Sequence, residues 1–187
     1  MALVGTTASK VSYADLAQWP DDGRRYELYD GEVVVVPAPV PRHQRAVLRI
    51  ARILDEYARD HRGEAFGAPL DIVVSRFDLV QPDVVYVGRE RRSQIDLDRP
   101  LRFPPDLAVE LLSPGTESID RGRKMQLLAR FGVPEYWLVD PYEHTVEVYR
   151  LTDGAYQLTQ RAVEGDVVHS ATLAGLEFPC AQIFADI

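Results

Sequence analysis

Apolar and polar positions along this 187-residue chain form blocks with the spacing of helices and strands. Residues 12–19 predict a short helix, and Ser12 is placed to cap its first turn. RYELYDGEVVVVP then predicts a β-hairpin, because Asp30 and Gly31 favour a two-residue turn between strand-forming flanks. Residues 43–61 carry one apolar stripe at three- and four-residue spacing, which predicts an amphipathic helix.

Beyond residue 63 the pattern changes to short apolar runs that are typical of buried strands. A second helix is predicted from residue 119 to residue 131, where Gly132 and Pro134 end it. Residues 153–187 are expected to add one or two short strands and a closing segment. Strands are predicted over residues 65–75, 81–87, 107–112, 135–141 and 145–151.

This order of elements predicts an α+β fold, with a central mixed β-sheet flanked by helices and an N-terminal β-hairpin. We expect residues 1–187 to form one domain, because the length is ordinary for a single hydrophobic core. The composition fits a folded protein, since 46% of the residues are hydrophobic and 27% are charged.

Several functional classes are disfavoured by what the sequence lacks. No segment approaches the roughly 20 consecutive apolar residues of a membrane span, and the N-terminal residues lack a signal-peptide pattern. Cys180 is the single cysteine, which excludes an internal disulfide framework and a cysteine-only zinc site. These features predict a cytoplasmic protein without a membrane partner. The net charge of −8 argues against nonspecific coating of nucleic acid, but it is compatible with a nuclease whose site is acidic.

Two carboxylates stand in surroundings that disfavour a solvated charge. Asp83 opens the apolar strand of QPDVVYV, and Glu110 lies in the middle of the apolar run PDLAVELLSP. Each has a simpler interpretation. Asp83 alone reads as an ordinary aspartate at a strand edge, and Glu110 reads as a strand-edge residue or as the structural partner of a buried arginine.

Lys124 is a cation in a similar position. On a helical wheel at 100° per residue it falls within the apolar arc that Leu127, Leu128 and Phe131 form. Such a lysine either extends to solvent or meets a carboxylate. The simpler interpretation is a surface pair with Asp120, four residues earlier.

Two strand carboxylates and an inward lysine suit the binding of a hard divalent cation such as Mg²⁺. Asp83 and Glu110 would supply oxygen ligands, with the backbone carbonyl of Leu111 as an additional candidate. The cation would activate a water and bind a scissile phosphate, while Lys124 would orient that water or stabilise the transition state. Arg121 and Arg123 flank Lys124 and are candidate contacts to nucleic-acid phosphates.

At these residues the sequence resembles the Uma family of restriction-endonuclease-like proteins, which belongs to the PD-(D/E)XK nuclease superfamily. The resemblance is carried by QPDVV, PDLAVELLSP, the lysine of the following helix and GVPEYWLVDP. It extends from YELYDGEVV and PRHQR near the N-terminus to the last strands. The resemblance implies a restriction-endonuclease-like core and a metal-dependent phosphodiesterase.

The resemblance also assigns residues one by one. Asp83 matches the PD aspartate, Glu110 matches the acid of the second motif, and Lys124 matches a lysine that has moved to the helix. The usual position of that lysine, two residues after the acid, is Leu112 in this chain. Supporting positions fall on the polar pair that begins the first long helix and on an acid of the hairpin, namely His43, Gln44 and Glu32.

We therefore predict a nuclease that uses Mg²⁺ or Mn²⁺ to hydrolyse nucleic-acid phosphodiester bonds, with DNA as the first expected partner. The alternative is a module on the same fold that binds nucleic acid or protein without turnover. Intact Asp83, Glu110 and Lys124 favour the enzyme, and the net charge of −8 favours the binder. A homodimer is a further expectation, with the apolar GVPEYWLV segment and the terminal strands as the candidate interface.

Overall fold

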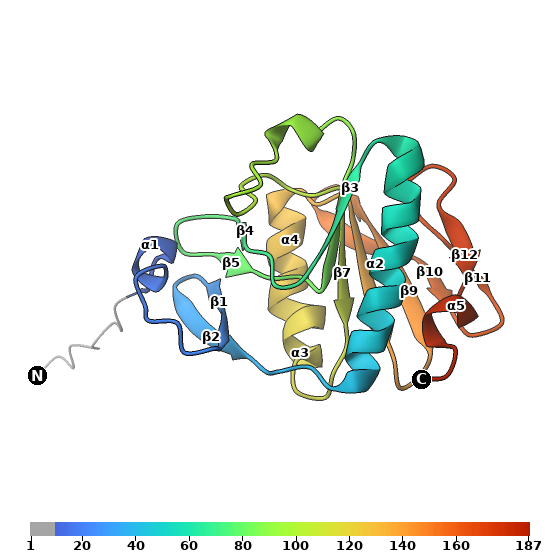
Figure 1. The fold of residues 1–187 in the computed structure, drawn as a ribbon, viewed down its shortest axis with the longest axis horizontal. Coiled ribbons are helices and arrows are strands. Elements are labelled where there is room, and N and C mark those ends of the chain that lie inside the picture. The colour runs from blue at the N-terminus through green and yellow to red at the C-terminus, as the bar shows by residue number, and fades with distance from the viewer. Residues whose placement is uncertain (1–9) are drawn as a thin grey trace, which may run out of the picture.

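The computed structural model describes residues 10–187 and is built around a six-stranded sheet in the order β10-β9-β8-β7-β6-β3 (Figure 1). Only β7 and β8 pair in parallel in this sheet, and its other neighbours are antiparallel, so the sheet is mixed as predicted. The strands are β3 (Glu64–Gly67), β6 (Val84–Val87), β7 (Leu107–Leu111), β8 (Glu135–Asp140), β9 (Thr145–Thr152) and β10 (Ala155–Ala162).

A smaller sheet in the order β2-β1-β5-β4 contains the predicted N-terminal hairpin. The turn residues Asp30 and Gly31 both have positive φ, of 50° and 78°, as a tight two-residue hairpin turn requires. The strands of this sheet are β1 (Arg25–Tyr29), β2 (Glu32–Val36), β4 (Ile72–Val73) and β5 (Leu79–Val80). Near the C-terminus, β11 (Val167–His169) and β12 (Glu177–Pro179) form a separate pair.

Helices cover both faces of the large sheet, and β7 runs between α2 and α4 in Figure 1. Ser12 caps α1 through a capping box with Asp15, as its position predicts. The predicted second helix is three consecutive pieces, α3, the π-helical turn η2 and α4. The helices are α1 (Tyr13–Leu16), α2 (Pro41–His61), η1 (Arg92–Gln94), α3 (Glu117–Ile119), η2 (Asp120–Lys124), α4 (Met125–Phe131) and α5 (Ala181–Phe184).

The alternation of side chains along β7 decides which helix each residue faces. Leu107, Val109 and Leu111 belong to the core cluster that includes the buried stripe of α2. Ala108 and Leu112 belong to the cluster that includes Leu127 and Leu128 of α4. Glu110 shares the parity of Ala108, so the strand directs its carboxylate toward the side of η2 and α4.

Three expectations need correction. Residues 65–75 do not form one strand, because Pro69 separates β3 of the large sheet from β4 of the small one. Residues 153–187 form three strands and α5, since β10 is a full partner of β9. The GVPEYWLV segment is not available as a dimer interface, because β8 is buried between β7 and β9.

Among residues 10–187, no helix combines the length and the apolar character needed to cross a membrane.

Candidate active site

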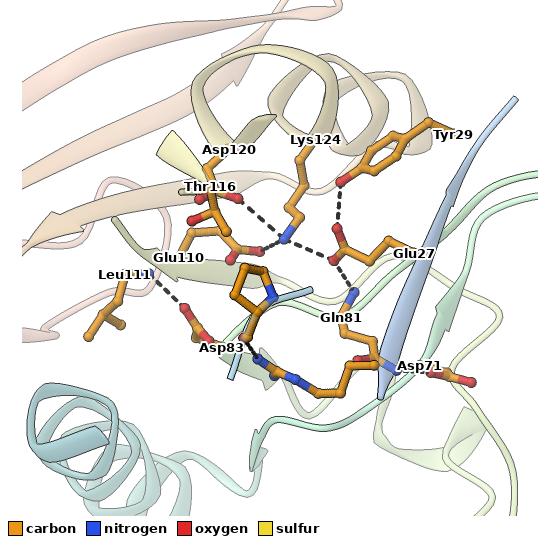
Figure 2. A network of polar contacts seen from close by, with 12 residues as sticks. Glu27, Tyr29, Asp71, Gln81, Asp83, Glu110, Leu111, Thr116, Asp120 and Lys124 are labelled. Carbon is orange, nitrogen blue, oxygen red and sulfur yellow. Dashed lines mark hydrogen bonds and ion pairs between the residues drawn. The ribbon is translucent and has the colours of Figure 1, made fainter. Parts of the chain in front are cut away.

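The antiparallel pairing of β6 with β7 brings Asp83 and Glu110 to the same place. Val84, the first residue of β6, lies opposite Val109, so Asp83 directly before β6 comes close to Glu110. The Leu111 amide donates a hydrogen bond of 2.9 Å to Asp83 Oδ2, which fixes the aspartate against β7 (Figure 2).

Lys124 reaches the same point from η2 and is 4% exposed. Its Nζ lies 2.9 Å from Glu110 Oε1 and 2.9 Å from Glu27 Oε1, and 3.4 Å from Asp120 Oδ1 (Figure 2). The pair with Asp120 therefore exists, but it does not hold the lysine at the surface, because Asp120 is itself only 2% exposed. We call Glu27, Asp83, Glu110, Asp120 and Lys124 the carboxylate–lysine cluster.

Glu27 is a member of this cluster that the sequence analysis missed. It lies in β1, is 2% exposed, and accepts hydrogen bonds from the backbone N–H of Gln81 (2.8 Å) and the Tyr29 hydroxyl (2.7 Å). The sequence pattern that indicated Glu110 is also present at Glu27, because Glu27 stands between Tyr26 and Leu28 just as Glu110 stands between Val109 and Leu111. These contacts hold Glu27 in place to contact Lys124.

Burial and neighbouring charge perturb the titration of the cluster. Burial raises the pKa of Glu110 well above its usual value, and Asp120, Asp83 and Glu27 add to that effect while Lys124 opposes it. Burial would lower the pKa of Lys124, but Glu110, Glu27 and Asp120 outweigh it and raise that pKa. The lysine therefore stays ionised, and Glu110 gains a proton at a higher pH than a solvated glutamate does.

His43, at the start of α2, contacts the cluster from the other face of the sheet. Its Nε2 lies 3.1 Å from Asp83 Oδ2, and the side chain is largely buried. Its Nδ1 is buried without a hydrogen-bond partner among the residues that the structure describes. His43 can thus orient Asp83, which agrees with the supporting role predicted for it, although that role stays a prediction.

The cluster lines a pocket of about 230 Å³. Its acidic side consists of Glu27, Asp83, Glu110 and Asp120. Residues 34–40 form another side, and residues 111–116, with Ile119 and Tyr142, complete the lining together with Arg25, His43, Gln81 and Lys124.

Four predicted site residues lie outside this pocket. Glu32 is largely exposed and pairs with Arg123 at 2.8 Å, because it begins β2 on the solvent side of the hairpin. Gln44 is exposed on the outer side of α2, one position beyond the inward-facing His43. Arg121 pairs with Glu117 and Glu147, at 2.9 and 2.6 Å. Arg123 is the fourth residue, and its partner is Glu32. Because carboxylates offset the charges of Arg121 and Arg123, the prediction that these arginines contact phosphates is weakened.

The donor set fits a hard divalent cation. The cluster contains four carboxylates and one ammonium group, which pairs with three of them, so it carries an excess of three negative charges when all are ionised. Glu110 Oε1 has Lys124 as its ionic neighbour, but within the described chain it receives no hydrogen bond of good geometry. Asp83 and Glu110 are the residues that would hold Mg²⁺ or Mn²⁺, which commonly bind through one or two carboxylates and several waters.

This set is smaller than a cage made wholly by side chains. Residues 10–187 contain no group of three or more His, Cys, Asp or Glu side chains arranged to hold a metal ion. The expected site is therefore one in which waters and substrate complete the coordination.

Comparison with known proteins identifies relatives over most of the chain. Residues 13–181 match the model of the family Uma2, described as "Putative restriction endonuclease". Two proteins of Synechocystis sp. are similar, and both are described as uncharacterized. The protein slr1290 is 27% identical over 77% of this chain and 76% of its own length, and sll1609 is 23% identical over 86% and 92%.

A solved structure shares the fold. The crystal structure of a "putative nuclease" from Anabaena variabilis superposes with a TM-score of 0.77, covering 93% of this chain and 97% of its own. At 18% identity this similarity establishes the architecture alone, an α+β fold with a central mixed sheet flanked by helices.

Proposed function

Since the chain belongs to the Uma2 family, we propose that it is a nuclease that hydrolyses nucleic-acid phosphodiester bonds with the help of Mg²⁺ or Mn²⁺. DNA is the first expected substrate. We expect a single cytoplasmic domain, as the sequence predicts, and a homodimer that forms through the terminal strands.

One observation carries this proposal. Lys124 Nζ lies 2.9 Å from Glu110 Oε1 inside a pocket that Asp83 also lines. Two carboxylates suited to a cation and an ionised lysine within hydrogen-bonding distance are the groups that phosphodiester hydrolysis needs. A purely structural ion pair does not require a pocket, nor a second acid opposite Glu110.

The roles of the residues follow from their contacts. A bound Mg²⁺ would supply Lewis acidity at a phosphate oxygen and lower the pKa of a bound water. Asp83 and Glu110 would hold this ion, and His43 and the Leu111 amide keep the Asp83 carboxylate in a fixed orientation. The Lys124 ammonium donates hydrogen bonds to the attacked phosphate or to the attacking water, where negative charge develops.

Glu27 acts as a positioning residue for Lys124. Because Glu27 is itself held by Gln81 and Tyr29, it restricts the lysine to the side of the pocket where Glu110 lies. A lysine with four flexible methylenes loses much less entropy in the reaction when its position is fixed beforehand.

The test is a cleavage assay on single- and double-stranded DNA and RNA, with Mg²⁺ or Mn²⁺ and with EDTA. We expect metal-dependent cleavage by the wild-type protein and none by Asp83→Ala. Glu32→Gln is the matched control, because it removes an exposed carboxylate outside the pocket. Failure of the wild-type protein to cleave any of the four substrates would favour the binding module without turnover.

A further inference from the structure

The pocket has two chemically different sides. The carboxylate–lysine cluster forms its acidic side. Residues 34–40, with the sequence VVVPAPV, form an apolar side in which Val35 is 48% and Val40 is 50% exposed. A ligand that matches both sides has an apolar part and a phosphate part, with a cation between the phosphate and the acids.

An aromatic side chain stands at the same pocket. Tyr142 follows β8, lines the pocket and is 50% exposed. The guanidinium of Arg42, from the first turn of α2, lies 5.3 Å from the centre of the Tyr142 ring and donates a 3.1 Å hydrogen bond to the Pro141 carbonyl. We call these two side chains the Arg42–Tyr142 platform. Aromatic rings and guanidinium planes are the groups on which proteins stack unpaired bases.

The positive charge near the pocket suits one or two phosphates. Arg25 and Arg42 are hydrogen-bonded to backbone carbonyls of Pro37 and Pro141, so both keep their net charge. Arg121 and Arg123 are instead paired with carboxylates. A protein that binds the phosphate backbone of duplex DNA commonly neutralises about 6–10 phosphates with lysine and arginine, which is more than two arginines can provide.

We propose that the pocket binds one unpaired nucleotide of a single-stranded nucleic acid, with its base at the Arg42–Tyr142 platform and the apolar side, and its phosphate at Asp83 and Glu110. The assignment of the phosphate to the carboxylates rests on the proposed function. In a continuous duplex the bases are stacked and paired, so no base face is free to meet Tyr142 or residues 34–40. DNA and RNA single strands share this chemistry.

The inference is tested by binding rather than by cleavage. A fluorescein-labelled mixed-sequence 20-mer is titrated by anisotropy in Ca²⁺, as single-stranded DNA, single-stranded RNA and the DNA duplex, with a gel to show that each probe stays intact. We expect tighter binding of a single strand than of the duplex. Tyr142→Ala should weaken single-strand binding by about 5- to 150-fold, since stacking on an aromatic contributes about 1–3 kcal/mol per base. Tyr142→Phe should retain it.

Trp19→Ala is the matched control, because Trp19 is an exposed aromatic that does not line the pocket. Equal or tighter binding of the duplex, no binding of any probe, or an unchanged affinity in Tyr142→Ala would each overturn the inference. The two proposals fail separately. Tyr142-dependent binding of a single strand without cleavage contradicts the nuclease alone, and Asp83-dependent cleavage of duplex that Tyr142→Ala leaves unchanged contradicts the single-strand pocket alone.

Discussion

Lys124 links three buried carboxylates that belong to different parts of the chain, Glu27 in β1, Glu110 in β7 and Asp120 in η2. In Lys124→Met the apolar bulk of the side chain stays and the ammonium is lost. We expect cleavage to fall by about 10²–10³-fold, the effect of removing one donor that stabilises developing charge. Metal binding, measured by titration with Mn²⁺, should survive because Asp83 and Glu110 are intact.

A control variant is needed because Lys124→Met also lowers the stability of the fold. Removing the cation leaves buried carboxylates without their partner, a change that typically costs about 3–5 kcal/mol. The double variant Lys124→Met with Glu27→Gln removes one of those carboxylates and should recover part of the loss. Wild-type cleavage rates in either folded protein would contradict a catalytic Lys124.

Glu110→Gln should change how stability depends on pH. Burial raises the pKa of Glu110 in the folded state, so its contribution to stability is full below its usual pKa and is lost as pH rises through the raised value. The wild-type protein should therefore lose stability relative to Glu110→Gln as the pH rises above about 4.3. Urea denaturation of both proteins between pH 4.5 and about 8 checks this, without divalent metal. A loss of about 3–5 kcal/mol in the variant at neutral pH would show instead that Glu110 is a structural partner of Lys124.

At the level of single residues, the sequence predicted that Asp83, Glu110 and Lys124 come together, because Glu110 and Lys124 interrupt apolar patterns and Asp83 opens an apolar strand. Their roles stay predictions. The sequence did not predict Glu27, although Glu27 also interrupts such a pattern. The hairpin that contains Glu27 was predicted from its Asp-Gly turn, and such a turn does not indicate which face of the hairpin is buried. The contact of β1 with η2 joins residues that are almost a hundred positions apart, and local periodicity carries no information about it.

At the level of elements, the helical wheel placed Lys124 correctly although the local geometry is not that of an α-helix. The wheel assumed 100° per residue, whereas Asp120–Lys124 forms a π-helical turn. Such turns are short and frequently occur at functional sites. Asp120 and Lys124 stay on one face despite the π-helical turn, and both are buried in the carboxylate–lysine cluster.

Gly122 in this turn offers a test of how the element is stabilised. A Cβ added at Gly122 would meet no described atom within 4 Å, and the residue does not have a positive φ. Gly122→Ala should therefore raise the free energy of unfolding by about 0.5–1 kcal/mol, because alanine loses less backbone entropy in a helix. Urea denaturation measures the change, and cleavage should keep the wild-type rate. A loss of stability would mean that the π-helical turn depends on glycine at this position.

The wrong prediction of one strand over residues 65–75 also arose because local sequence does not specify long-range pairing. Both halves of that segment are strands, and Pro69 marks the break between them. Propensity identifies a strand without identifying its sheet, and here β3 and β4 belong to different sheets. The assignment depends on pairing with β6 and β5, which only the folded chain establishes.

At the level of the whole molecule, the net charge of −8 and the acidic cluster lead us to expect that divalent cations stabilise the fold. A cation that binds only the folded state stabilises it by about 2.7 kcal/mol when its free concentration is 100 times the dissociation constant. For a chain of this size each kcal/mol raises the melting temperature by about 2–4 °C.

Saturating Mn²⁺ should therefore raise the melting temperature of the wild-type protein by about 5–10 °C. The shift should be absent in Asp83→Ala combined with Glu110→Gln, because that protein lacks both expected ligands, and should remain in Glu32→Gln, whose carboxylate lies outside the pocket. It should shrink as the pH falls, because the raised pKa of Glu110 makes protons compete with the metal for that carboxylate. Differential scanning fluorimetry with and without Mn²⁺ measures all three proteins. If the double variant kept the full shift, the cation would bind elsewhere, and Asp83 and Glu110 would not be its ligands.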